Sequence, residues 1–148
     1  MTYNKIRHLQ LLKRFLDLKN KGKDLYTENR DDYMELLYYR SRLEDHIFWT
    51  NRKQFVLLMN NLIYGLIDMK KFEITFSRLW NETFRADSAF EMNLKLIENL
   101  QLDPRSDGFG SFITAVFRQF EILEDEECTE QDVKNYVQNT LREIQPYL

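Results

Sequence analysis

The sequence contains a single cysteine, four glycines and two prolines among its 148 residues. Cys128 alone can form neither an internal disulfide nor a cysteine-based metal cluster, and this favours a reducing compartment. Because glycine and proline are scarce, the chain has few residues suited to turns. We therefore expect long helices joined by short connections.

Long apolar runs and targeting signals are also missing. No stretch approaches the roughly 18 consecutive apolar residues that a membrane-spanning helix needs. The N-terminus lacks an apolar segment followed by a small-residue cleavage site, so we expect a protein that is not secreted. Asn, Lys and Ile are common and have AT-rich codons, which suits an organellar or bacterial open reading frame. The expected location is the cytoplasm or the plastid stroma.

No catalytic, cofactor or metal motif can be recognised. The two histidines, His8 and His46, stand far apart and have no second histidine or cysteine at helical spacing. Cys128 follows four consecutive acids, whose charge raises a thiol pKa and disfavours a nucleophile. The net charge of −3 gives no global attraction to nucleic acid, so no direct nucleic-acid contact is expected. The sequence predicts a protein that is not an enzyme and needs no cofactor.

The segment from Gln54 to Asp87 carries the strongest structural pattern. Apolar residues recur at steps of three and four on both sides of Asp68, which predicts a helical hairpin with one buried face on each arm. Phe76 lies on the buried stripe of the second arm together with Phe72 and Leu79, and Phe84 is a further candidate for that stripe.

Other segments repeat this helical pattern. Asp31 and Asp32 suit the start of a helix that runs to about Trp49. Ser88 and Glu91 have the spacing of a capping box and predict a new helix that ends by Leu102, before Pro104. Residues 103–110 form a loop, a helix follows from Phe112, and Thr129 with Asp132 predicts the cap of the last helix. We therefore predict an all-α fold, a compact bundle of about six helices.

The first 23 residues form a separate basic stretch, with seven basic residues and one acid. Ile6, Leu9 and Leu12 share one helical face, and Gly22 suits the C-terminal cap. We expect residues 1–30 to be a basic amphipathic helix with a polar connection and residues 31–148 to be the bundle domain. The helix can dock on the bundle with a solvated basic face, or it can contact a membrane surface or nucleic acid.

Seven acids without an intervening base lie between Glu121 and Asp132. One interpretation is a solvated turn whose acids favour the N-terminus of the last helix. The other is a docking surface for a basic partner, where charge speeds association and sets orientation.

The run Leu62–Glu82, LIYGLIDMKKFEITFSRLWNE, resembles the colicin D immunity-type family, and the resemblance extends over about residues 54–145. The shared features are a short helix, a turn, a Phe-containing amphipathic helix, an acidic connection and a closing helix pair. Proteins similar to this family are small helical bundles that bind and block a tRNA-cleaving toxin with acidic side chains. The resemblance and the acidic run together select Asp103, Asp107, Glu121, Glu124, Asp125, Glu126 and Glu127 as candidate partner-binding residues.

The resemblance thus implies a protein-binding module, an immunity-like inhibitor of a basic nuclease toxin. The alternative is an accessory or structural subunit of a larger assembly, docked through the basic N-terminal helix. A broad exposed apolar patch on that helix would favour the subunit, and an acidic concave face would favour the inhibitor.

Overall fold

The computed structural model describes all 148 residues and contains eight α-helices and no strand, which confirms the all-α prediction. Six helices are long, in agreement with the expected number, and α2 and α6 are short. The bounds are α1 Lys5–Asn20, α2 Leu25–Glu28, α3 Arg30–Thr50, α4 Arg52–Ile63, α5 Met69–Glu91, α6 Leu94–Glu98, α7 Phe109–Glu124 and α8 Glu130–Ile144, with 3-10 turns η1 Pro104–Ser106 and η2 Gln145–Tyr147.

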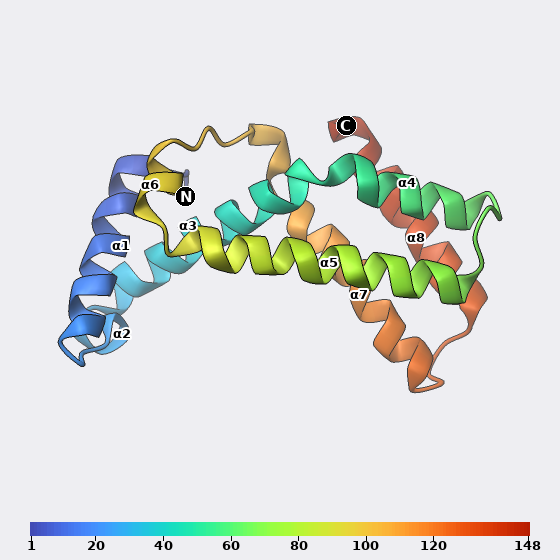
Figure 1. Cartoon of the computed structure of the whole chain (residues 1–148), viewed down its shortest axis with the longest axis horizontal. Helices are drawn as coiled ribbons and strands as arrows, with labels where there is room; N and C mark the ends of the chain where they lie inside the picture. Colours follow the sequence, from blue (N-terminus) through green and yellow to red (C-terminus); the bar gives the residue numbers. More distant parts are fainter.

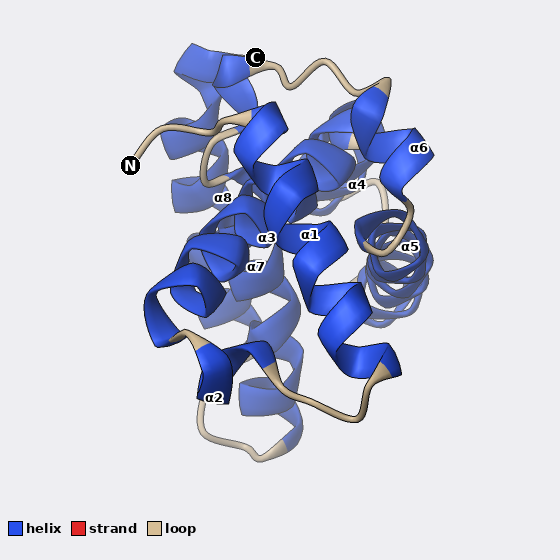
Figure 2. Cartoon of the chain, turned by 90° about the vertical axis from the view of Figure 1, so that its left-hand side faces the viewer, coloured by secondary structure: helices blue, strands red, loops and turns tan.

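Two long helices, α3 and α5, run through the molecule and connect its ends (Figure 1). Helices α1, α2 and α6 gather at one end, and α4, α7 and α8 pack around the other. Figure 2, seen from the α1 end, shows α5 almost end-on beside α1 and α6. The apolar side chains form two clusters in the same way: a large core from α3, α4, α5, α7 and α8, and a smaller core around α1, α2, α3 and α6.

The hairpin predicted around Asp68 is formed by α4 and α5. The Asp68 carboxylate accepts a hydrogen bond from the Lys71 backbone N–H at 2.8 Å and so caps α5. Phe72 and Phe76 are fully buried. The ring of Phe76 lies 5.3 Å from that of Phe55 on α4 and 5.7 Å from that of Phe120 on α7, between centroids. The hairpin stripe is therefore the centre of the larger core.

The predicted helix start at Ser88 is wrong, because α5 continues to Glu91. The Ser88 hydroxyl donates to the Phe84 carbonyl inside the helix at 3.1 Å, so it caps nothing. The break comes five residues later, where Asn93 accepts from the Leu96 N–H and starts α6. The apolar stripe of α5 also ends earlier than expected, since Phe84 is 42% exposed.

The start of α3 also differs from the prediction. Asn29 is the cap and accepts from the Asp32 N–H at 3.1 Å, so Asp31 and Asp32 occupy the first turn. The polar connection before it contains α2, whose Leu25 is buried in the smaller core. The predicted caps at Gly22 and at Thr129 with Asp132 are confirmed, with φ of +70° at Gly22 and a reciprocal capping box in α8.

Helix α7 has no capping side chain of its own, because it begins after Gly108. Its cap comes from α3. Asp45 accepts the backbone N–H of Gly108 at 2.9 Å with Oδ2 and that of Gly110 at 2.9 Å with Oδ1. A carboxylate at this position satisfies two free donors and opposes the positive end of the helix dipole. Asp45 thus fixes α7 to α3.

The N-terminal helix is packed on the rest of the chain. Leu11 and Leu12 are buried in the smaller core. Arg7 forms ion pairs with Asp32 at 2.9 Å and Glu35 at 2.7 Å, and Arg14 also pairs with Asp32. None of the helices is both long enough and apolar enough to cross a bilayer.

Replacing Phe76 by Ala should lower the free energy of unfolding by about 3–5 kcal/mol, because it leaves a cavity among three other rings. Phe84→Ala, on the same helix but exposed and stacked on Trp80, should cost less than about 1.5 kcal/mol. Urea unfolding of both variants measures the difference. Equal losses would mean that Phe76 does not lie in the core.

Gly110→Ala should destabilise the fold although alanine favours a helix by about 1 kcal/mol. The new Cβ would lie 3.0 Å from Asp45 Oδ1 and 3.5 Å from Asp45 Cα, so the capping carboxylate would have to move. We expect a net loss of about 1 kcal/mol or more in urea melts. Ser111→Ala, the exposed neighbour, should stay within about 0.5 kcal/mol of the wild type. A Gly110→Ala variant as stable as wild type would show that the contact is not tight.

Candidate protein-binding site

The structure divides the seven candidate residues into two groups at opposite ends of α7. Asp103 and Asp107 precede the helix, and the other five lie at or beyond its C-terminal end. A helix of 16 residues is about 24 Å long, so the two groups cannot form one compact site.

The first group is engaged within the protein. Asp103 caps η1 by accepting from the Arg105 N–H at 2.9 Å, and its carboxylate binds the Arg105 guanidinium at 2.8 Å. This partner holds the pKa of Asp103 well below its usual range. Asp107 is more available, since its side chain is 73% exposed and its one ion pair, to Arg42, spans 3.5 Å. Both acids thus have partners within the protein, close to the start of α7.

The second group forms what we call the acidic turn: Glu121, Glu124, Asp125, Glu126 and Glu127. All five side chains are exposed, and none lies within 4 Å of a basic nitrogen. In Figure 1 the turn between α7 and α8 projects below α5 at the lower right. The charge is thus presented on a protruding surface, and no acidic concave face is formed by these residues.

A sixth acid joins the turn from a distant part of the chain. Glu73 of α5 lies beside Glu124, and burial first, then the hydrogen bond and charge of Glu124, raise the pKa of Glu73. Glu73 could not be found from the sequence, because it stands beside the apolar stripe of α5, 51 residues before Glu124. The pairing shows that negative charges lie close together at this end, and Glu73 forms no ion pair within 4 Å.

The backbone of the acidic turn is itself strained at one residue. Glu127 donates to the Ile122 carbonyl and Glu126 to that of Leu123, both at 3.1 Å, which is the Schellman pattern that ends a helix. The residue at the left-handed position of this motif is usually glycine, but here it is Glu126, with φ of +57°. A side chain in this conformation costs on the order of 1 kcal/mol.

The remaining candidates have structural roles. His8 is fully buried against Tyr3 and Tyr39, and burial lowers its pKa to about 4, so it is uncharged at neutral pH. No three His, Cys, Asp or Glu side chains are placed to hold a metal ion. Trp49 is buried in the larger core, and Trp80 packs against that core and stacks on Phe117 at 4.2 Å between centroids.

A groove of about 520 Å³ lies between the N-terminal half of α7 and the C-terminal half of α8. Phe112, Ala115 and Tyr136 supply its apolar lining, and Glu143 is its one charged residue. The groove contains no residue of the acidic turn and no pair of groups suited to acid–base chemistry. It therefore adds nothing to the candidate site.

Comparison with known proteins gives no relative: no family model, no curated protein and no solved structure matches this chain. The site must therefore be interpreted from its own geometry and charge.

Glu126→Gly should raise the free energy of unfolding by about 1 kcal/mol, because glycine adopts the left-handed conformation without a Cβ clash. Glu126→Gln is the matched control, since it removes the same charge but keeps the strained backbone. Urea melts should show a gain for the glycine variant that the glutamine variant lacks. Equal stability of the two variants would show that the conformation at Glu126 stores no strain.

Proposed function

We propose that this chain is a non-enzymatic protein-binding module that presents its acidic turn to a basic, concave surface of a partner protein. The partner class that fits best is a nuclease toxin, whose cationic active site an immunity-like protein would block. The single observation that carries the proposal is the acidic turn itself: five exposed carboxylates that form no ion pair within the chain, joined by Glu73.

Negative charges lie close together at the acidic turn, so binding of a cationic partner is favourable there. The pKa of Glu73 is raised first by burial and then by the hydrogen bond and charge of Glu124, so ionised Glu73 is disfavoured beside Glu124. Lysine or arginine side chains of a partner would relieve this repulsion and form new hydrogen bonds with the carboxylates. Acids at the rim of an interface chiefly accelerate encounter, and they favour basic over acidic partners.

The strain at Glu126 supports the same proposal. A solvated turn has no need of an acid at the left-handed position, where glycine would be more stable. Residues that keep a strained conformation at the cost of stability are concentrated at functional sites. A role of the Glu126 carboxylate in binding a basic partner would explain why glutamate, and not glycine, occupies this position.

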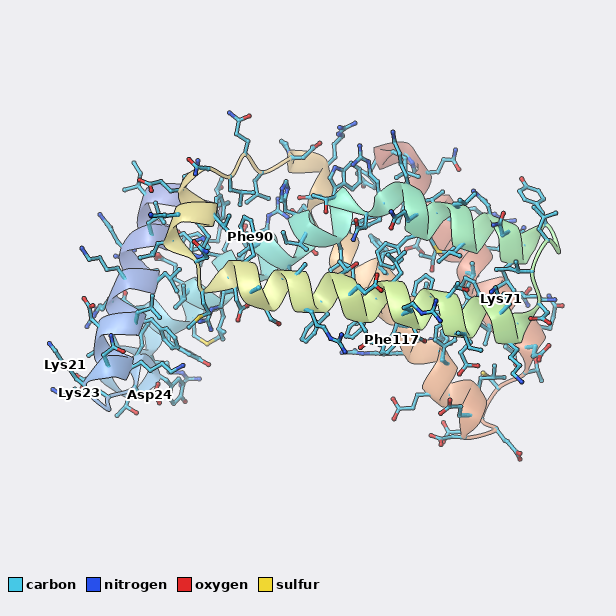
Figure 3. All side chains as sticks on the ribbon, viewed as in Figure 1. Lys21, Lys23, Asp24, Lys71, Phe90 and Phe117 are labelled. Atoms are coloured by element: carbon cyan, nitrogen blue, oxygen red, sulfur yellow. The ribbon has the colours of Figure 1, made fainter.

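Both signs of charge occur at each end of the molecule, so the acidic turn is a local feature. Figure 3 shows Asp24 beside Lys21 and Lys23 at the α1–α2 end, and Lys71 at the end that carries the acidic turn. The exposed Tyr64 and Leu66, at the α4–α5 turn on the same end as the acidic turn in Figure 1, are suited to apolar contacts beside the charged ones.

The alternative, docking of α1 in a larger assembly, has less support. The apolar face of α1 is already buried against α3 and α6, and its only exposed large hydrophobic residue is Ile6, at 71%. Two of its bases are held by Asp32. No broad apolar patch is left on this helix for a partner.

The proposal predicts that removing charge from the acidic turn slows association with the partner. Glu124, Asp125, Glu126 and Glu127 are replaced together by Gln or Asn, which keeps shape but removes four negative charges. Association should slow and its dependence on salt should flatten, while stability changes little, because exposed charges contribute weakly. The measurement is binding kinetics at low and moderate ionic strength against the partner purified from the native cell.

The matched control removes four exposed acids that lie elsewhere: Asp17, Glu28, Glu82 and Glu98. Both variants have the same net charge, so a slower association in both would indicate only an overall charge effect. Inhibition of tRNA cleavage by the recovered partner then tests the immunity-like role. An acidic-turn variant that associates as fast as the control, with the same salt dependence, would contradict the proposal.

A further inference from the structure

The two apolar cores are separated by polar residues on both helices that connect them. Along α5 the inward positions change from Phe76 in the larger core to Thr83 and Asp87, and then to Phe90 beside the smaller core. Along α3, Glu44 stands between Leu43 of the smaller core and Phe48 of the larger one. Phe90 is labelled in Figure 3 near the end of α5 that faces α6. We call Arg40, Glu44, Asp87 and Glu91 the polar seam.

Asp87 is the least satisfied member of the polar seam. It is only 4% exposed, and its Oδ1 has no hydrogen-bond partner. The one base of the seam is held elsewhere: the Arg40 guanidinium lies 4.7 Å from the ring of Phe15, and its Nη2 donates to Met92 Sδ at 3.6 Å. The Arg40 Nε is likewise buried without a partner. A buried carboxylate so placed is costly when it is ionised.

The charges that act on Asp87 come from two helices. Glu44, Arg40 and Asp45 belong to α3, and Glu91 belongs to α5 itself. On α1, the neutral His8 faces Arg40 and adds no positive charge. Three of the four charged neighbours are therefore acids, and one is a base that forms no hydrogen bond with Asp87.

We propose that the polar seam is a proton-controlled contact between the two cores. With Asp87 protonated, the C-terminal part of α5 packs against α3. Loss of the proton places a negative charge beside Glu44 and Glu91 in a buried setting, and this favours opening of α5 and the attached α6 away from α3. This device lies at the opposite end of α5 from Glu73, and it does not depend on the proposed function.

The pH range follows from the carboxyl group. Burial first, and then the charges of Glu44 and Glu91, raise the pKa of Asp87 to about 7, against the ordinary value of 3.8. The closed form binds a proton more tightly than the open form, so closure is most stable below about pH 4. Its stability falls as the pH rises from about 4 to about 7 and is then constant. The contact therefore responds to pH between about 4 and about 7.

Hydrogen exchange measured by mass spectrometry tests the proposal on the full chain. Peptides from residues 83–98 and 40–47 are compared at pH 5.5 and 8.5, after correction for the intrinsic pH dependence of amide exchange. The Asp87 carboxyl has a pKa of about 7 in the closed form and the ordinary value of 3.8 in the open form. This difference predicts that the open fraction rises roughly 30-fold from pH 5.5 to pH 8.5. Peptides of α8 serve as the internal reference and should not show this rise.

Asp87→Asn removes the titrating group with little change in shape and should abolish the rise, leaving α5 closed at both pH values. Glu82→Gln, an exposed acid on the same helix, should behave as the wild type. The proposal is overturned if the corrected exchange of the wild-type seam is the same at both pH values. It is also overturned if Asp87→Asn shows the same rise as the wild type, or if α8 opens to the same extent, because the change would then be global.

Discussion

The position of α7 depends on one buried carboxylate of another helix. Asp45 accepts both glycine N–H groups at the start of α7, and Arg42 lies 3.4 Å from the same carboxylate. Burial raises the pKa of Asp45, and the two backbone bonds and the Arg42 charge oppose that rise. A Cβ at position 110 would lie 3.0 Å from Asp45 Oδ1, so glycine lets the carboxylate keep its position. One side chain thereby satisfies a helix end, places α7 against α3 and fixes the direction in which α7 leads away from the joint.

The attachment of α7 to α3 through Asp45 links the fold to the proposed function. Helix α7 carries the acidic turn about 24 Å from Asp45, so the orientation of the helix decides where the charge is presented. The larger core holds the helix along its length through Ile113, Val116 and Phe120. The acids can therefore remain unneutralised and exposed, because nothing in the stability of the fold requires partners for them. Two costly features lie outside this framework: the left-handed backbone of Glu126 at a helix end, and the buried carboxyl of Asp87 between the cores.

Much of the fold could be predicted from local patterns, and the exceptions have physical causes. The Phe72–Phe76 stripe, the Asp68 cap and the Thr129–Asp132 box involve residues within one or two turns of each other, so spacing predicts them. Ser88 and Glu91 had the spacing of a cap, but α5 continues through them, with Asp87 buried and Phe90 packed on the smaller core. The capping role of Asp45 could not be predicted from the sequence, since its hydrogen-bond partners lie more than 60 residues away. From the sequence, a loop is expected over residues 103–110 and a helix from Phe112, whereas α7 already begins at Phe109, so no helix start was expected at Gly108. In the candidate site, the acidic turn could be predicted as a run of charge, whereas Glu73 and the separation of Asp103 and Asp107 required the tertiary structure.

The most direct test of the account is amide hydrogen exchange at the start of α7, resolved by residue with NMR. The first N–H groups of a helix usually exchange freely, because they have no partner within the helix. The Asp45 joint predicts strong protection at Gly108 and Gly110, comparable to that of amides inside α3, while the neighbouring Ser111, which has no such acceptor, exchanges fast. Equally fast exchange at Gly108, Gly110 and Ser111 would contradict the account, since α7 would then have no fixed attachment to α3.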